Sequence, residues 1–176
     1  MLKVFILLAL ALVSSLFVNA QSTKLIVADF NQGERITNLG EEFGAWNKDS
    51  TDSTQSCQIS FAQDDALGDA KGKSLQLIYD VDSPNPAYNG FWLKISNAKI
   101  IDFDTLSFYV KGDANKGFTK KIKIELKDKN KGKATFVIEN ITNEWQKISL
   151  TLDKRSMDEK QALKCQAMPI FIINFF

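Results

Sequence analysis

The segment from Ser74 to Val110 reads SLQLIYDVDSPNPAYNGFWLKISNAKIIDFDTLSFYV, and it contains three runs in which apolar and polar residues alternate. The apolar members are Leu75, Leu77, Tyr79 and Val81 in the first run, Phe91, Leu93 and Ile95 in the second, and Leu106, Phe108 and Val110 in the third. Alternation with a period of two residues predicts β-strands that bury one face of a sheet. The connecting stretches SPNP and SNAKIIDFD are rich in turn-forming residues, so the segment predicts part of a half-buried antiparallel sheet.

Further runs of the same kind occur on both sides of this segment. They predict additional strands at Lys24–Phe30, Cys57–Ala62, Lys121–Asp128, Lys133–Ile141, Glu144–Leu152 and Pro169–Phe176. The stretch from Asn31 to Trp46 contains three glycines and predicts a wrapped loop. About nine short strands without a long amphipathic helix predict an all-β sandwich of two antiparallel sheets.

The first twenty residues have the composition of a secretory signal peptide. Lys3 precedes an apolar run from Val4 to Val13, and Val18, Asn19 and Ala20 form a small-residue cleavage signal. A membrane anchor is the alternative, but Ser14 and Ser15 interrupt a run that is already short for a bilayer span. We therefore expect one domain over residues 21–176, secreted to the periplasm or the extracellular space and free of the membrane after cleavage.

Charge and residue types exclude several functions. The chain has 22 basic and 21 acidic residues, so nothing in its charge favours nucleic acid as a partner. Histidine is absent, which excludes histidine-ligated zinc, Ser-His-Asp chemistry and a histidine general base. The two cysteines, Cys57 and Cys165, either form one disulfide or remain two free thiols, and the sequence leaves both open.

Several short motifs resemble carbohydrate-binding modules of family 11 and the related complex I intermediate-associated protein domain. At the start of the domain they are Asp29-Phe30, Asn38-Leu39-Gly40 and Gly44-Ala45-Trp46. The likeness continues through Ser74–Val81, Gly90-Phe91-Trp92, Leu106–Gly112, Lys123–Asp128 and Trp145-Gln146-Lys147. The order and spacing of these motifs cover nearly all of the expected mature chain.

This resemblance implies a galactose-binding-like jelly-roll sandwich that is not catalytic. Members of the family often bind β-glucans on one sheet face, or act as accessory domains beside glycoside hydrolases. Many hold a structural calcium, for which Asp29 is the matching candidate ligand here. Family domains end in a further strand with an acidic pair. The present sequence stops before such a strand, so we expect it to be C-terminally truncated, and the calcium site is correspondingly in doubt.

Two groups of acidic residues bear on calcium independently of the resemblance. Asp29 is followed closely by Asn31 and Glu34, and Asp64, Asp65 and Asp69 lie in one predicted loop. Calcium prefers several oxygen ligands at flexible spacing, whereas an acidic loop is more often simply solvated. No EF-hand pattern is present.

The second face of the predicted sheet is the candidate binding surface. By strand parity, Trp92 and Lys94 point away from Phe91 and Leu93, and the same parity places Tyr109, Lys111 and Glu125 on that face. Sugar rings pack their C–H faces on aromatic planes, and their hydroxyls need polar partners. We expect Trp92 and Tyr109 to stack on sugar rings, and the other three residues to bind hydroxyls. Alternatively, a loop or a neighbouring strand covers Trp92 and Tyr109.

The sequence thus predicts a secreted, non-enzymatic module that binds a polysaccharide such as a β-glucan. A second hypothesis is a protein-interaction or assembly domain of the complex I intermediate-associated type, and an accessory domain of a glycoside hydrolase is a variant of the first. An unrecognised hydrolase is the third, since paired carboxylates cannot be placed from sequence alone.

Overall fold

The computed structural model describes residues 24–63, 67, 72–95, 103–127 and 133–152, together with the backbone of residues 170–175. The predicted signal peptide, the acidic residues Asp64, Asp65 and Asp69, and Cys165 lie outside the described residues.

The described residues form nine strands, and all of the pairs between these strands are antiparallel. They are β1 (Phe43–Asn47), β2 (Ser56–Gln63), β3 (Lys73–Asp80), β4 (Asn89–Lys94), β5 (Thr105–Val110), β6 (Ile122–Lys127), β7 (Lys133–Ile138), β8 (Gln146–Thr151) and β9 (Ile170–Phe175). No helix occurs in these ranges, so none of the described segments is a helix long and apolar enough to cross a membrane. The prediction of an all-β fold is confirmed.

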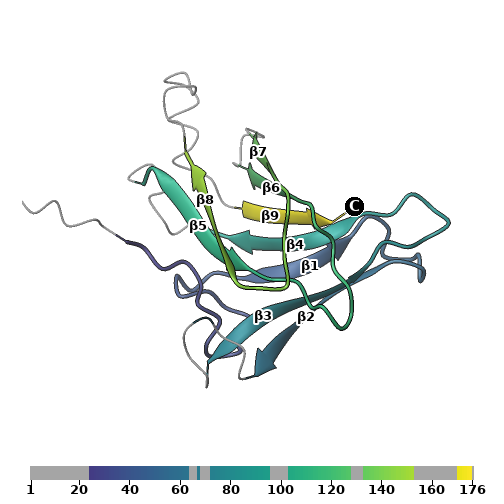
Figure 1. Cartoon of the computed structure of the whole chain (residues 1–176), viewed down its shortest axis with the longest axis horizontal. Coiled ribbons are helices and arrows are strands. Elements are labelled where there is room, and N and C mark those ends of the chain that lie inside the picture. The colour runs from purple at the N-terminus through teal and green to yellow at the C-terminus, as the bar shows by residue number, and fades with distance from the viewer. Residues whose placement is uncertain are drawn as a thin grey trace, which may run out of the picture.

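The strands form one large sheet and two hairpins (Figure 1). The large sheet has five strands in the order β1-β4-β9-β6-β7. The others form two separate two-stranded sheets, β2–β3 and β5–β8. The strands β2 and β3 are consecutive in the chain, whereas β6 and β7 lie between β5 and β8, and we refer to both pairs as hairpins only for brevity. Apolar residues of both hairpins pack against the buried core, which gives a sandwich-like arrangement with the five-stranded sheet as one layer.

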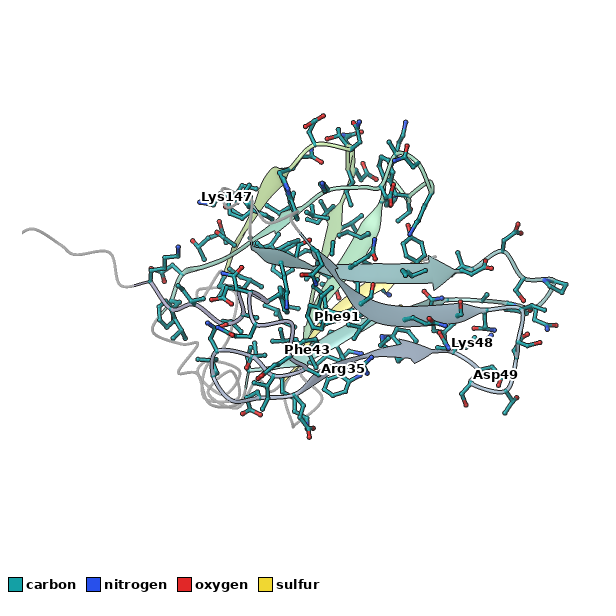
Figure 2. All side chains as sticks on the ribbon, turned by 90° about the horizontal axis from the view of Figure 1, so that it is seen from below. Arg35, Phe43, Lys48, Asp49, Phe91 and Lys147 are labelled. Atoms are coloured by element: carbon teal, nitrogen blue, oxygen red, sulfur yellow. The ribbon has the colours of Figure 1, made fainter. Side chains whose placement is uncertain are left out.

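The core lies on the face of the five-stranded sheet that the hairpins cover. Phe91, Leu93 and Ile95 are at most 5% exposed, and Ile122, Ile124 and Leu126 are at most 2% exposed, as their alternation predicts. The ring of Phe43 contacts Phe91 within the sheet, with centroids 5.7 Å apart, and reaches Phe61 of β2 at 6.5 Å. Figure 2 shows Phe43 and Phe91 in the interior of the molecule.

Two predicted boundaries near the N-terminus are wrong. Lys24–Phe30 is not a strand, because Asp29 and Asn38 exchange hydrogen bonds of 2.9 Å and the backbone of Phe30 has a φ of 61°. The predicted loop of residues 31–46 instead contains most of β1. Gly44 fits within that strand because the indole of Trp92 occupies the space above it, where a Cβ atom would lie only 2.8 Å from the ring.

A large cleft separates the two hairpins. Its volume is about 1890 Å³, and it is lined by β3, by β5 and by the inward-facing residues Phe91, Leu93 and Ile95 of the larger sheet. The segment that follows β5 returns to β3, where the backbone N–H of Thr119 donates a 2.6 Å hydrogen bond to the hydroxyl of Tyr79. Among the described strands, β3 pairs only with β2 and β5 only with β8, so each hairpin presents a sheet edge toward this cleft.

The burial pattern makes Ile124 the central residue of the core. We expect Ile124→Ala to lower the free energy of unfolding by about 2–5 kcal/mol, because Ile124 is 0% exposed and its loss leaves a cavity. Val137→Ala on the neighbouring strand β7 is the matched control. Val137 is 52% exposed, so its truncation should cost less than about 1 kcal/mol. Urea unfolding of both variants measures the difference, and equal losses would contradict this assignment of the core.

Candidate functional site

The outer face of the five-stranded sheet, which points away from the hairpins, carries the candidate site. Strand register places its side chains in rows across the sheet. Gly44 pairs with Trp92, and the Cα of Ile172 in β9 is the partner of both Trp92 and Glu125. Directly opposite residues of neighbouring strands point to the same face, so Trp92 and Glu125 lie on one surface, two strands apart.

Trp92 provides a flat aromatic surface on this face. Its indole lies against the backbone of Gly44, so the glycine allows the ring to rest on β1. Trp92 is half-buried, and the Nζ of Lys94 lies 5.6 Å from its ring centroid. A cation at this distance is attracted to the electron-rich face of the ring. The ring is thus held in place between β1 and Lys94.

Two further aromatic residues continue the surface along β1. Trp46 lies two residues beyond Gly44 on the same face, and its ring contacts Tyr88 edge-to-face at 5.7 Å. Tyr88 is 44% exposed, and the Nζ of Lys48 lies 5.4 Å from its ring centroid. We call Trp92, Trp46 and Tyr88 the aromatic strip.

A hydrogen-bonded loop pair supports the Tyr88 end of the aromatic strip. The carboxylate of Asp52 accepts hydrogen bonds from the backbone and side chain of Thr54, and from the side-chain amides of Gln55 and Asn85. These hydrogen bonds hold the pKa of Asp52 well below its usual range. They join the loop after β1 to the loop before β4, which carries Tyr88, and Figure 2 shows Lys48 and Asp49 at this end of the molecule.

An exposed ion pair lies beside Trp92. The Nζ of Lys94 donates a 2.7 Å hydrogen bond to the Oε2 of Glu42, whose side chain is 70% exposed. This hydrogen bond lowers the pKa of Glu42 and raises the pKa of Lys94, so both groups are charged at neutral pH. A donor and an acceptor side by side, next to an aromatic plane, match the hydroxyl pairs of a sugar ring.

Glu125 has a different environment from the one expected of a hydroxyl-binding residue. Its side chain is 6% exposed, and both oxygens are occupied by lysines. Lys123 and Lys133 lie 3.4 and 3.3 Å from Oε1, and Lys127 lies 2.9 Å from Oε2. Burial alone would raise the pKa of Glu125, but the hydrogen bonds and charges of the lysines lower it to about 2. We call the three lysines around Glu125 the lysine cluster.

The structure does not bring Tyr109 and Lys111 to this surface. Tyr109 belongs to β5, where it pairs with Lys147 of β8, and Lys111 follows directly after that strand. Tyr109 is 47% exposed, and the Nζ of Lys111 lies 5.2 Å from the ring centroid of Trp145. The expectation that Tyr109 shares a face with Trp92 is wrong, because parity fixes sides only within one sheet and β5 pairs outside the five-stranded sheet.

The carboxylate of Asp29, the candidate calcium ligand, accepts hydrogen bonds from neighbouring residues. One carboxylate oxygen accepts a 2.9 Å hydrogen bond from the side-chain amide of Asn38, and the other accepts a 3.1 Å hydrogen bond from the backbone of Asn31. Within the described ranges, no three acidic, histidine or cysteine side chains come together in a way that could hold a metal ion. Calcium also takes carbonyl and amide oxygens as ligands, so binding at Asp29 stays a prediction from the family resemblance.

Cys57 lies in the core, and the described residues contain no second cysteine with which it could pair. Burial raises its pKa to about 11, so the thiol is protonated and unreactive at neutral pH. Pairing of Cys57 with Cys165 remains a prediction, since Cys165 lies outside the described residues.

No known protein family, curated protein or solved structure matches this chain.

Three members of the site were not identified from the sequence as binding residues. The sequence does not predict Trp46, Tyr88 or Glu42 to bind a ligand. If residues 43–47 are recognised as a strand, alternation predicts that Trp46 and Lys48 point to the same face as Gly44. Tyr88 and Glu42 lie just outside strands and reach the face through contacts with Trp46 and Lys94.

The ion pairs between Glu125 and the lysine cluster should contribute to the free energy of unfolding in a pH-dependent way. Because the folded pKa of Glu125 lies near 2, below its ordinary value of 4.5, the contribution is complete above pH 4.5 and is lost as the pH falls through about 2. We expect Glu125→Gln to lower the free energy of unfolding by about 1–3 kcal/mol at pH 7, the range allowing for screening at the exposed lysines. Urea unfolding should show this difference shrinking between pH 4.5 and 2.

Glu139→Gln is the control for this experiment. Glu139 pairs with Lys121 at 2.9 Å, but its side chain is 60% exposed. We expect a much smaller change in stability at pH 7, because solvent screens an exposed pair. A pH-independent loss in Glu125→Gln would contradict the stabilising role of the ionised carboxylate.

Proposed function

We propose that the protein is a non-catalytic polysaccharide-binding module whose binding surface is the outer face of the five-stranded sheet. The observation that carries this proposal is the aromatic strip of Trp92, Trp46 and Tyr88, which runs over adjacent strands beside the Lys94–Glu42 ion pair. Aromatic planes take the apolar faces of sugar rings, and charged groups beside them bind the hydroxyls.

The arrangement suits an extended ligand better than a small enclosed one. The strip lies on the face opposite the cleft, since none of its residues is among those that line the cleft. Gly44 lies against the ring of Trp92 at one end, and the Nζ atoms of Lys94 and Lys48 lie over the rings of Trp92 and Tyr88. An open row of supported rings can stack on successive sugars of one chain. A β-glucan is the substrate class that the resemblance favours.

The finer fold assignment belongs to the same proposal. The all-β architecture with a five-stranded antiparallel sheet supports a galactose-binding-like jelly roll. Secretion follows from the predicted signal peptide. The same surface would serve an accessory domain of a glycoside hydrolase, which binds the polymer while another domain cleaves it.

Affinity gel electrophoresis with soluble β-glucans, mannans and xylans tests the proposed surface. We expect the migration of the wild-type protein to be retarded by at least one of these polymers, and Trp92→Ala to abolish the retardation. Losing a stacking ring removes the main apolar contact, and the half-buried position of Trp92 leaves the core in place. Retention of the wild-type retardation by a folded Trp92→Ala variant would contradict this site.

Tyr109→Ala is the matched control for this experiment. Tyr109 is an exposed aromatic residue on β5, outside the proposed surface. We expect its removal to leave retardation unchanged. An equal loss in both variants would indicate binding across both layers or a nonspecific aromatic effect.

The cleft favours a second function, that of a protein-interaction domain. The edges of β3 and β5 line it together with half-buried apolar residues of these strands, so an extended segment with alternating apolar residues could pair with both edges and place its apolar side chains on Leu77 and Phe108. At about 1890 Å³ the cleft exceeds the usual range of small-molecule sites, about 300–1,000 Å³.

Hydrogen–deuterium exchange distinguishes binding of a polypeptide in the cleft from binding of a glycan on the outer face. A polypeptide partner that binds in the cleft should protect backbone amides in both β3 and β5, whereas a glycan on the outer face should leave them unchanged. A co-purified partner that protects neither strand would exclude the cleft as its binding site.

A further inference from the structure

The lysine cluster is arranged by a single buried carboxylate. Glu125 is 6% exposed at its side chain, whereas the side chains of Lys123, Lys127 and Lys133 are 37%, 41% and 51% exposed. Each ammonium group lies within 3.4 Å of a carboxylate oxygen while its side chain remains accessible to solvent. The buried carboxylate thus restrains the three lysine side chains before any ligand binds. Ligand binding therefore costs less side-chain entropy than it would with three freely moving lysines.

The cluster has an excess of positive charge. Among the described residues, three ammonium groups surround one carboxylate, whereas the described ion pairs Lys94–Glu42 and Lys121–Glu139 are balanced one to one. The chain as a whole has a formal net charge of only +1. The positive charge on the outer face is therefore a local feature and not the consequence of a generally basic protein.

The cluster and the aromatic strip lie on the same surface. Trp92 and Glu125 share the Cα partner Ile172, so they are two strand spacings apart, or about 10 Å. Lys123 and Lys127 flank Glu125 along β6, and Lys133 lies on β7 opposite Lys127. A polymer that crosses the strands from Trp92 toward β7 passes from the aromatic rings to the ammonium groups.

We infer that the ligand of this face is an acidic polysaccharide, whose carboxylate or sulfate groups bind the lysine cluster while its sugar rings stack on the aromatic strip. This inference rests on the proposed function and narrows its substrate class. Glu125 is then a positioning residue that does not touch the sugar, because both of its oxygens are occupied by lysines. Lysine ammonium groups act as point charges, so the cluster suits carboxylate and sulfate alike.

Nucleic acid is the competing polyanion, and the charge of the whole chain counts against it. Domains that bind nucleic acid commonly have isoelectric points above 9, whereas the value for this sequence is about 7.7. Among the described residues of the outer face, the excess charge lies at one carboxylate and its three lysines.

Affinity electrophoresis with four polymers tests the inference. The probes are polygalacturonate, dextran sulfate, a neutral soluble β-glucan and poly(U), each at low and at raised ionic strength. We expect the wild-type protein to bind at least one acidic polysaccharide more tightly than the neutral glucan. Raising the salt concentration should weaken the acidic interaction and leave the neutral one nearly unchanged.

The double substitution Lys127→Gln/Lys133→Gln tests the cluster directly. We expect binding of the acidic polysaccharide to weaken roughly 3- to 10-fold, as for the loss of two partly exposed charge contacts. Binding of the neutral glucan should stay at the wild-type level. The charge-preserving variant Lys127→Arg/Lys133→Arg should retain acidic binding, and it keeps the test decisive if the glutamine variant does not fold.

Lys116→Gln/Lys147→Gln is the matched control, since it removes two exposed lysines outside the five-stranded sheet. It should leave the binding of every polymer unchanged, and a loss of acidic binding equal to that of the cluster variant would overturn the inference. Wild-type binding of neutral but not acidic polysaccharide would overturn the inference and leave the proposed function standing. Binding of no polysaccharide would overturn both, and tighter binding of poly(U) than of either acidic polysaccharide would assign the face to nucleic acid.

Discussion

The architecture depends on the burial of one face of the five-stranded sheet. Ile124 is fully buried and Phe91 is 2% exposed, and both point toward the hairpins. Because successive residues of a strand point to opposite faces, these two positions force Trp92 and Glu125 onto the outer face. A shift of one residue in the register of β4 would bury Trp92 and Lys94 and expose Phe91 and Leu93, so core packing also fixes the candidate site.

The local part of this arrangement is readable from the sequence, and the non-local part is not. The alternation around Phe91 and around Ile124 predicts both strands and their buried sides correctly. Alternation contains no information on which strand pairs with which. Tyr109 was therefore assigned to the face of Trp92, although β5 pairs with β8 and lies outside the five-stranded sheet. Register between distant strands depends on packing that appears only when the chain is folded.

The prediction of a loop where β1 lies is wrong for the same reason, because a contact between residues distant in sequence decides the structure. Three glycines between Asn31 and Trp46 indicate a loop when only neighbouring residues are considered. Gly44 nevertheless lies inside β1, because a residue almost fifty positions later, Trp92, lies over it and fills the space that a side chain would occupy. The contact makes Gly44 and Trp92 one structural unit. It explains why the outer face has a supported aromatic ring at that point.

Glu125 shows that strand parity can place a residue on the correct face without predicting what surrounds its side chain. Parity puts it on the outer face, where the structure also finds it. An exposed glutamate there would accept hydroxyl hydrogen bonds, but this one is buried beneath three lysine side chains. Its own charge is thereby hidden from a ligand, and the charge presented to solvent has the opposite sign. The chemistry of the face is therefore set by side-chain packing between β6 and β7, which strand periodicity does not encode.

The two candidate surfaces share β4 and are otherwise separate. Phe91 and Leu93 lie on the cleft side of β4, while Trp92 and Lys94 form one end of the proposed binding surface on the outer face. A ligand in the cleft and a ligand on the outer face would lie on opposite sides of β4 and would not meet. Energetic coupling between the two surfaces would require a displacement of β4, which is held by ladders to β1 and β9 and by the buried side chains of the core. Because no such displacement is needed for binding to an open sheet face, occupation of one surface should have little effect on the affinity of the other.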